Sequence, residues 1–420
     1  MASVVFYFQV HQPHRLRRYS VFDADPFYFD QQKNGDICRK VAEKCYRPTT
    51  NLILDLVKRH KGRFKVSYAI TGTVLDQWAE FTPDVIDIFK RLAETGCCEF
   101  LAETYYHSLS FLYSREEFDS QVRAHTKRIQ DLFGHTPKVF RNTELIYNND
   151  LAHYVAGMTD DAGKPRFLGG ICEGTDRLLG YRSPNYVYKP PHTGNGPHGK
   201  PFGILLKNYR LSDDIAFRFS NRGWAEWPLS AEKFAGWVNQ INGDGYICNL
   251  FMDYETFGEH QWEDTGIFKF LDALPEKVFD VNPGHNDFLS PTEALMKFDP
   301  VGVYDVPHVI SWADTERDLS AWLGNAMQSN ALNEIYRLER SVKNKLARAE
   351  QGGDAGAVNN ARGVYDDWRK LTTSDHFYYM STKYWADGDV HKYFSPYDSP
   401  YDAYINYMNA MDNLRTRAAG

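Results

Sequence analysis

The sequence lacks the features that mark secreted and membrane-spanning proteins. It has only six cysteines in 420 residues, and no two of them have the C-x-x-C spacing of a metal or redox pair. Scattered reduced thiols are the simplest interpretation, which indicates a reducing compartment. No apolar run is long enough to span a bilayer, and the opening run SVVFYFQV has no basic segment before it. This run is therefore expected to be a strand, in a cytoplasmic protein with no membrane partner.

An excess of positive charge is also absent. The net charge is −7, which argues against nucleic acid or an anionic membrane surface as the main partner. The chain has no internal repeat, no low-complexity linker and no long block of one charge. Its 43% hydrophobic and 25% charged residues are ordinary for a globular protein. The sequence does not determine the oligomeric state.

Aromatic residues, in contrast, are abundant. They make up 15% of the chain, with 27 Tyr, 27 Phe and 9 Trp. Flat rings with polar edges suit a sugar-binding cleft, because the apolar face of a sugar stacks on a ring while its hydroxyls form hydrogen bonds. A large aromatic core accounts for this composition equally well.

Short β-rich runs alternate with amphipathic helical patterns through roughly the first three hundred residues. The expected strands are residues 3–10, 64–71, 99–102, 138–141, 203–207 and 246–253. The expected helices between them are residues 39–60, 84–95, 115–133 and 231–241, and residues 290–293 (SPTE) have a capping-box pattern. Such alternation predicts parallel strands with crossover helices, and hence an α/β barrel or a doubly wound sheet.

After about Trp312 the pattern becomes helical. Residues 314–350 are expected to form one long helix, either continuous or interrupted, and residues 357–371 and 401–417 two more. No flexible linker separates this part from the rest, so we expect a helical bundle packed on the preceding domain. The predicted division is a catalytic barrel in residues 1–310 and a bundle in residues 311–420.

Four short segments place polar groups at the end of a predicted strand. They are residues 9–13 with His11 and Gln12, residues 96–99 with Glu99 and His107 eight residues later, residues 141–147 with Glu144 and Tyr147, and residues 251–260 with Asp253, Glu255 and His260. In a barrel, catalytic groups collect where strands end. Singly, each signal is weak, because such carboxylates commonly cap helices. Together they fit glycoside cleavage, which needs two carboxylates flanking the scissile bond.

These segments resemble the sequence regions of glycoside hydrolase family 57, which comprises α-amylases, 4-α-glucanotransferases and branching enzymes. HQP resembles the first region, GCCEFLAETYYH the second, NTELIY the third, MDYETFGEH the fourth and, in the helical part, DHFYYMSTKYW from Asp375 a fifth. The resemblance is closest to the shorter α-amylase-like members. It implies a distorted (β/α)7-type barrel followed by a C-terminal α-helical bundle. One departure is Arg141, where many family members have Trp.

The resemblance also implies a retaining mechanism through a covalent glycosyl-enzyme intermediate. Glu144 matches the family's nucleophile and Asp253 its general acid/base. Retention requires the two carboxyl groups to lie roughly 5 to 5.5 Å apart. The pair must hold different protonation states, so the pKa of Asp253 is expected to be raised by burial and by the charge of Glu144.

Eight further residues are expected to bind the sugar: His11, Gln12, Glu99, His107, Tyr147, Glu255, His260 and Trp262. Imidazoles and carboxylates bond hydroxyls in fixed directions, although bracing of the catalytic pair is an equal alternative for the histidines and Glu99. Trp262 is a candidate stacking platform, together with Trp224 and Trp227. The expected substrate is an α-glucan or a maltooligosaccharide, with no metal and no cofactor.

Three alternatives remain open at this point. The first is a zinc-dependent barrel hydrolase built on His11, His14, His107, Asp253 and His260, although no H-x-D or H-x-x-x-H pair occurs around His11. The second is a 4-α-glucanotransferase or branching enzyme of the same family, because water and sugar acceptors compete for one intermediate. The third is an inactive α-glucan-binding protein.

Overall fold

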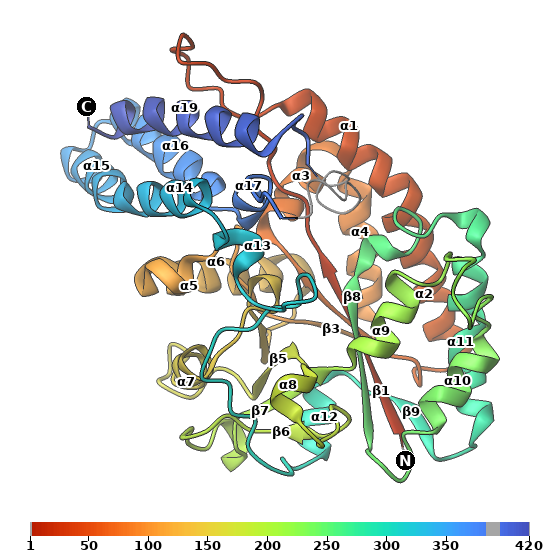
Figure 1. The fold of residues 1–420 in the computed structure, drawn as a ribbon. Coiled ribbons are helices and arrows are strands. Elements are labelled where there is room, and N and C mark those ends of the chain that lie inside the picture. Colours follow the sequence, from red (N-terminus) through yellow and green to blue (C-terminus); the bar gives the residue numbers. More distant parts are fainter. Residues whose placement is uncertain (1, 384–394, 420) are drawn as a thin grey trace.

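The computed structural model describes residues 2–383 and 395–419 of the chain. A strand-containing domain, wrapped by helices, lies beside a bundle of helices from the C-terminal part of the chain (Figure 1). The long first strand β1 (Ala2–Val10) runs through the domain and is buried along its whole length.

The barrel is formed by two sheets. The first has the order β3-β2-β1-β8, with all pairs parallel, and consists of β1, β2 (Val66–Ile70), β3 (Cys98–Phe100) and β8 (Ile247–Asp253). The second has parallel strands β4 (Val139–Arg141), β5 (Gly169–Glu173) and β7 (Gly203–Lys207), with β6 (Val187–Tyr188) antiparallel to β7. A short strand, β9 (Asn286–Phe288), pairs with the first residues of β1.

The two sheets join at both edges and close a ring. Beyond β3, Ala102 forms a parallel bridge to Phe140 of β4, and its N–H donates to the carbonyl oxygen of Val139 at 2.9 Å. After β7, the N–H of Asn208 donates to the carbonyl oxygen of Asn249 in β8 at 2.9 Å. The seven strands β8, β1, β2, β3, β4, β5 and β7 thus form a distorted parallel barrel, which confirms the expected (β/α)7-type fold.

The amino-terminal end of this barrel is filled by α12 (Pro291–Lys297). Its Leu295 packs into the barrel interior, and a β-carbon at Gly203 would lie 2.5 Å from a methyl carbon of that leucine. A β-carbon at Gly169 would lie 2.1 Å from the carbonyl oxygen of Gly203, so both glycines are needed for this close packing. The carboxyl ends of the strands form the opposite end of the barrel, where catalytic groups of such folds collect.

Helices connect the strands and cover the barrel (Figure 1). They are α1 (Gln31–Val41), the π-helix η1 (Ala42–Tyr46), α2 (Arg47–Arg59), α3 (Gly72–Phe81), α4 (Pro83–Glu94), α5 (Ser110–Tyr113), α6 (Arg115–Phe133), α7 (Asn149–Ala156), α8 (Asp176–Leu179), α9 (Tyr209–Ala216), α10 (Ala231–Asn239) and α11 (Ile267–Val281). Short 3-10 turns are η2 (Thr143–Leu145), η3 (Pro197–Gly199), η4 (Tyr254–Thr256) and η5 (Glu263–Thr265). The predicted capping box of α12 is present, because Ser290 and Glu293 cap each other's backbone N–H groups.

The bundle consists of α13 (Ser320–Leu323), α14 (Ala326–Arg337), α15 (Glu339–Gly352), α16 (Ala355–Leu371), α17 (Ser374–Tyr378) and α19 (Pro400–Ala419). The helix expected over residues 314–350 is interrupted and begins only at Ser320. The chain breaks at Gly324, and Asn325 then starts α14 with a capping box to Gln328. Leu338 separates α14 from α15.

The bundle has a hydrophobic core of its own that extends into the N-terminal part of the chain. Trp322 and Trp368 of the bundle share this core with Leu16, Tyr19 and Tyr28, which follow β1. The segment after β1 therefore packs as part of the bundle, so contacts mix the two parts of the chain. The division at residue 310 stays a prediction.

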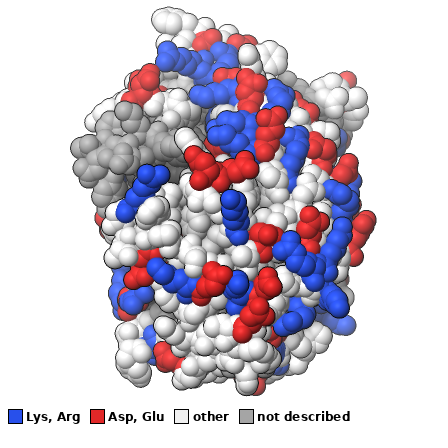
Figure 2. Space-filling model, turned by 90° about the vertical axis from the view of Figure 1, so that its right-hand side faces the viewer, with Lys and Arg blue, Asp and Glu red and all other residues white. Residues whose placement is uncertain are grey.

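All six cysteines are buried and free, as scattered reduced thiols would be. Within the part of the chain that the structure describes, no helix combines the length and apolarity needed to cross a membrane. On the side of the molecule that carries α2, α10 and α11, acidic and basic side chains are interspersed over the surface (Figure 2).

Candidate active site

Three of the four expected segments meet at the carboxyl end of the barrel, together with His107, which follows the remaining one. Asp253 is the last residue of β8 and pairs in register with Gln9 of β1. His11 follows β1, and Glu144 lies in the turn η2 directly after β4. Barrel closure thus brings residues from distant parts of the sequence to one place.

Gln9 connects the barrel interior to this cluster. Its Oε1 accepts a hydrogen bond from the hydroxyl of Tyr7 at 2.6 Å, and its Nε2 donates to both carboxylate oxygens of Glu103 at 3.2 and 3.3 Å. The Glu103 side chain is fully buried. Burial opposes its ionisation, but the hydrogen bond from His107 and the charge of Arg141 lower the pKa of Glu103 overall.

His107 joins two carboxylates. Its Nδ1 lies 3.2 Å from Oε2 of Glu103, and its Nε2 lies 3.1 Å from Oε1 of Glu144. Burial disfavours the charged imidazole, yet the hydrogen bonds to Glu103 and Glu144 raise the pKa of His107 to about 9. At neutral pH the ring is therefore an imidazolium, and each nitrogen donates a hydrogen bond to one carboxylate.

Glu144 is also held from the other part of the chain. The indole Nε1 of Trp312 donates to its Oε2 at 2.8 Å, and the Ser374 hydroxyl donates to its Oε1 at 3.3 Å. Burial would raise the pKa of Glu144, but the hydrogen bond and charge of His107 outweigh it and lower the pKa below its ordinary value. Glu144 is therefore an ionised carboxylate with a 19% exposed side chain.

The backbone around this carboxylate is strained. Glu144 has a φ of 57°, Leu145 a φ of 50° and His107 a φ of 51°, which is the left-handed region that side chains other than glycine rarely adopt. Such conformations cost of order 1–3 kcal/mol each and persist where the surroundings enforce them. The close contacts of His107 and Trp312 with Glu144 provide that constraint.

Asp253 has the opposite protonation preference. Burial is the largest influence on it, and together with the negative charge of Glu144 it raises the pKa of Asp253 to about 6. The positive charges of Arg141 and Lys207 act in the other direction and limit the shift. Two carboxyl groups with diverging pKa values are the arrangement that separates a nucleophile from a general acid.

His11 stacks on His107. The two ring centroids are 4.0 Å apart with an interplanar angle of 23°. Burial and the positive charge of His107 lower the pKa of His11, so its ring is neutral. Its Nε2 lies 2.8 Å from Oδ2 of Asp375 and its Nδ1 lies 2.9 Å from the Thr71 hydroxyl, which assigns the proton to Nε2 and makes Thr71 the donor to Nδ1. Asp375 comes from α17 in the bundle.

Arg141 ends β4 and Lys207 ends β7, the two strands that flank β5. Both cationic side chains lie near the ring of Trp312. The guanidinium carbon of Arg141 is 5.2 Å from the ring centroid of Trp312, and Nζ of Lys207 is 5.5 Å from the same centroid. Arg141 is fully buried, with Nη1 3.7 Å from Glu103. None of its three guanidinium nitrogens has a hydrogen-bond acceptor among the described residues. The departure noted at position 141 thus places a buried cation beneath the catalytic cluster.

Glu255 and Gln12 lie next to this cluster and are engaged with protein groups. The Tyr46 hydroxyl donates to Oε1 of Glu255 at 2.5 Å, and Gln12 also hydrogen-bonds this carboxyl. Burial, followed by the charge of Asp253, raises the pKa of Glu255 to about 8. Gln12 accepts a further hydrogen bond from Arg15 at 2.9 Å. These contacts brace the segment that carries Asp253.

Glu99 does not join the cluster, so its contacts do not support the expected role in sugar binding. Its carboxylate accepts hydrogen bonds from the backbone N–H of Thr292 at 2.9 Å and from the hydroxyl of the same residue at 2.6 Å. Thr292 lies in the first turn of α12, which fills the amino-terminal end of the barrel. Glu99 therefore fixes α12 at the end opposite to Glu144.

Three other residues that were expected to bind the sugar are placed away from the catalytic cluster or are held by other protein groups. Tyr147 is buried in a separate aromatic core and its backbone pairs with Ile310. Trp262 is 58% exposed and lines a groove formed with α2. His260 is held by its backbone N–H, which donates to the carbonyl oxygen of Glu255 at 2.9 Å, and burial lowers its pKa to about 4.

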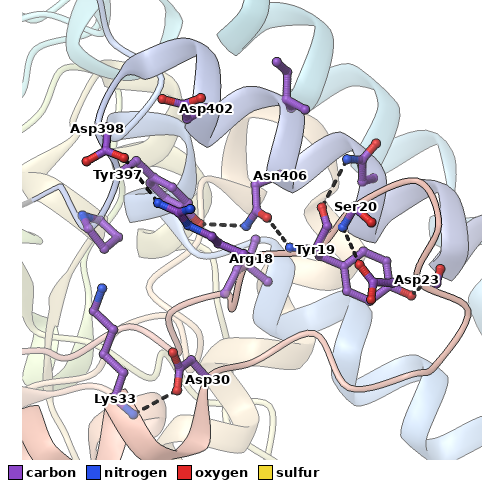
Figure 3. Close-up of a pocket in the computed structure, with 14 residues that line it drawn as sticks. Arg18, Tyr19, Ser20, Asp23, Asp30, Lys33, Tyr397, Asp398, Asp402 and Asn406 are labelled. Atoms are coloured by element: carbon purple, nitrogen blue, oxygen red, sulfur yellow. Dashed lines mark hydrogen bonds and ion pairs between the residues drawn. The ribbon is translucent and has the colours of Figure 1, made fainter.

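A separate cavity of about 880 Å³ lies between the segment after β1 and α19 (Figure 3). Asn406 of α19 spans its wall: its Oδ1 accepts from the N–H of Tyr19 at 2.5 Å, and its Nδ2 lies 3.2 Å from the Tyr397 hydroxyl. Arg18 and Asp398 form an ion pair across it at 3.3 Å. The lining residues belong to the bundle side of the molecule and do not include Glu144 or Asp253.

The chain was compared with known proteins. The model of glycosyl hydrolase family 57 matches residues 5–307. A protein of Methanocaldococcus jannaschii, named provisionally as an α-amylase, is 42% identical over 414 residues, which cover 97% of this chain and 83% of that protein.

Two solved structures share the fold. One is a branching enzyme of the same family from Pyrococcus horikoshii, with a TM-score of 0.66, 15% identity, and coverage of 94% of this chain and 87% of that one. The other is a 4-α-glucanotransferase from Thermococcus litoralis, with a TM-score of 0.61, 15% identity and coverage of 90% of this chain. The chain spans 56% of that glucanotransferase. The match of the family model over most of the sequence, together with the relative at 42% identity, shows that this chain belongs to glycosyl hydrolase family 57.

Proposed function

We propose that this protein is a retaining glycoside hydrolase that cleaves α-glucosidic bonds in starch- or glycogen-type α-glucans or in maltooligosaccharides. The α-amylase name of the M. jannaschii relative supports the choice of substrate. The observation that carries the proposal is that the two carboxyl groups favour different protonation states. The pKa of Glu144 is lowered, and the pKa of Asp253 is raised to about 6.

In the first step, a carboxylate oxygen of Glu144 attacks the anomeric carbon, and the bond to the glycosidic oxygen breaks. Asp253 gives its proton to that departing oxygen. In the second step, Asp253, now ionised, takes a proton from water while the water oxygen attacks the anomeric carbon and releases Glu144. The product keeps the α configuration, since each step inverts it once.

The groups around Glu144 keep its carboxylate ionised and oriented. The imidazolium of His107 and the indole N–H of Trp312 donate to different oxygens of Glu144, at 3.1 and 2.8 Å. Both contacts favour the ionised form of Glu144 and fix its direction. The same two donors also limit rotation of the carboxylate, which reduces the entropy lost when it attacks.

For the sugar itself, we propose contacts from the polar wall formed by His11 and Asp375, beside Glu144. The bond of 2.8 Å between His11 and Asp375 links the barrel to the bundle, so both parts of the chain contribute to this wall. Gln12, Glu255 and His260 act through the position of the neighbouring segments, because their described partners are protein groups.

The assignment of the two carboxyl groups can be tested by chemical rescue. Glu144→Gly and Asp253→Ala should each lose hydrolysis of an activated α-glucoside while keeping the far-ultraviolet circular dichroism of the parent. Azide should then restore turnover, giving the β-glucosyl azide with the Glu144 variant and the α-glucosyl azide with the Asp253 variant. The opposite assignment of products, or full activity in either variant, would contradict the proposal.

Transfer to a sugar acceptor is the second candidate, because two structures of similar fold are named as transferring enzymes, a branching enzyme and a glucanotransferase, while another of similar fold is named as an α-amylase. Chromatography of products from one pure maltooligosaccharide separates the two functions. Hydrolysis gives only shorter chains, whereas transfer gives longer or branched ones. Absence of any product would instead favour an inactive α-glucan-binding protein.

We also propose that the protein works in the cytoplasm, without a nucleic-acid partner. Six buried, free cysteines suit a reducing compartment. The net charge of −7 disfavours a polyanionic partner.

A further inference from the structure

A surface groove of about 820 Å³ lies between η1 and α2 on one side and the segment that follows the catalytic strand β8 on the other. This volume is within the range of small-molecule binding sites. Its lining residues are Glu43, Lys44, Pro48, Leu52, Gly258, Trp262, Glu263, Asp264 and Phe268. The groove thus combines aromatic, aliphatic and acidic side chains.

Trp262 is the central feature of this groove. Its side chain is large and apolar, yet it is 58% exposed. The indole Nε1 donates to the carbonyl oxygen of Glu259 at 3.1 Å, and Nζ of Lys44 lies 5.3 Å from the ring centroid. The ring is therefore fixed in an exposed orientation, although exposure of so much apolar surface costs free energy.

The backbone that carries Trp262 is fixed as well. Gly258 has a φ of 107°, and a β-carbon there would lie 1.9 Å from the carbonyl oxygen of Lys44, so only glycine allows this segment to pack on η1. Glu259 forms ion pairs with Lys40 at 2.6 Å and with Lys44 at 3.7 Å. A rigid, exposed ring of this kind loses little conformational entropy when a ligand stacks on it.

The negative charge of the groove limits the kinds of ligand that can bind there. The exposed carboxylates of Glu43, Glu263 and Asp264 line it, whereas its one lysine, Lys44, already faces Glu259. Such a rim repels phosphate, nucleic acid and acidic sugars. Carboxylate oxygens accept hydrogen bonds from neutral hydroxyl groups, and an indole face stacks on the apolar face of a pyranose ring. A neutral, polyhydroxylated chain therefore fits best.

The groove is separate from the catalytic cluster but close to it in the chain. On η1, Tyr46 faces the barrel and bonds Glu255, whereas Glu43 and Lys44 line the groove. Trp262 follows Asp253 by nine residues within the segment that connects β8 to α11. A polymer held in the groove would thus contact the same connecting segment and the same π-helix η1 that support Asp253 and Glu255.

We propose that this groove is a second binding site for an α-glucan chain, in which Trp262 is the stacking platform and Glu43, Glu263 and Asp264 accept hydrogen bonds from the sugar hydroxyls. The choice of an α-glucan rests on the proposed function. The site tethers polymeric substrate, and short maltooligosaccharides that reach only the catalytic cluster do not need it.

Binding can be measured without turnover in a Glu144→Gln background, by retardation in native gels that contain glycogen. Trp262→Ala should weaken the apparent affinity for glycogen about tenfold, within the range of a lost aromatic contact and its buried area. Trp262→Phe should restore part of it. The matched control is Tyr181→Ala, since Tyr181 is fully exposed and lies outside the groove, and it should leave retardation unchanged.

Kinetics with the active protein complete the test. Trp262→Ala should lower kcat/KM for glycogen at least fivefold more than kcat/KM for maltotetraose, mainly through KM. Unchanged retardation of Trp262→Ala, or an equal loss on both substrates, would overturn the proposal. If the parent protein does not cleave any α-glucan but its retardation by glycogen still depends on Trp262, the proposed hydrolase function fails while the second site stands.

Discussion

The Nε2 atom of His107 lies 3.1 Å from Oε1 of Glu144, and this contact joins two residues that both have left-handed backbone conformations. The contact makes the protonation states of the two residues interdependent. His107 is held as a cation by carboxylates on both sides, and its charge in turn keeps Glu144 ionised. In a buried site, this pairing overcomes the desolvation that would otherwise protonate the carboxylate.

Replacement of His107 by Gln should therefore change the acid side of the pH profile. In the parent, the lowered pKa of Glu144 places the acid limb of kcat/KM below pH 4.5, the ordinary value. Without the cation, burial raises that pKa, so the limb should move to higher pH. Loss of the donor should also lower kcat/KM at the optimum by about 100-fold. An acid limb that stays in place would show that His107 does not set the charge of Glu144.

The protonation of Asp253 should determine how kcat/KM falls on the alkaline side of the pH profile. The first step needs the protonated acid, so kcat/KM for an unactivated maltooligosaccharide should be lost as pH rises through about 6, the pKa of Asp253. Asp253→Asn should be at least about 100-fold slower on that substrate. With a fluoride leaving group, which needs no acid, the variant should recover most of the first step and show no limb near pH 6. Persistence of that limb in the variant would assign it to another group.

Much of the fold could be predicted because long buried strands have a clear sequence pattern. The apolar runs of β1 and β8 were found within one residue of their ends. In contrast, β5 (GGICE) was missed, because it begins with glycines, which have low strand propensity. Gly169 is required by its contact with Gly203 and by the nearby Leu295, and such contacts depend on tertiary packing.

The site was only partly predictable for a similar reason. Glu144 and Asp253 follow strands and lie in recognisable motifs, so sequence reasoning could name them. Trp312 and Ser374 contact Glu144 from a connecting loop and from the bundle, and no local pattern predicts that packing. Tyr147 lies close to Glu144 in the sequence, but its side chain is buried in a different core.

Arg141 should determine how far the pKa of Asp253 is raised. Its positive charge lowers this pKa more than Lys207 does, so Arg141→Met should move the alkaline limb of kcat/KM to higher pH, and Lys207→Met should move it in the same direction by less. Removing one partner of the buried pair with Glu103 should also destabilise the fold by about 3 kcal/mol. The pH profile should be recorded at a temperature where urea denaturation shows the variant to be folded. A limb that moves to lower pH would contradict this account.

Glu99 and Glu103 offer the sharpest comparison between sequence and structure. They are four residues apart, and Leu101 between them faces the barrel interior. Alternate residues of an extended chain point the same way, so both positions belong to one face, and their Cα atoms are about 13 Å apart along it. Glu99 bonds Thr292 at one end of the barrel, and Glu103 bonds His107 at the other.

The same substitution at these two positions should therefore have different effects. Glu99→Gln should weaken the anchoring of α12 and reduce the free energy of unfolding by about 1–2 kcal/mol, while kcat/KM stays within about twofold of the parent.

Glu103→Gln should lower the pKa of His107, because the carboxylate that raises it is neutralised. His107 should then lose its proton at a lower pH, and the charge of Glu144 would be less well held. The expected result is a large loss of kcat/KM that grows as pH rises from 6 to 8, measured beside urea denaturation of both variants. Equal losses of activity in the two variants would mean that Glu99 also acts on the catalytic cluster, against the contacts that place it on α12.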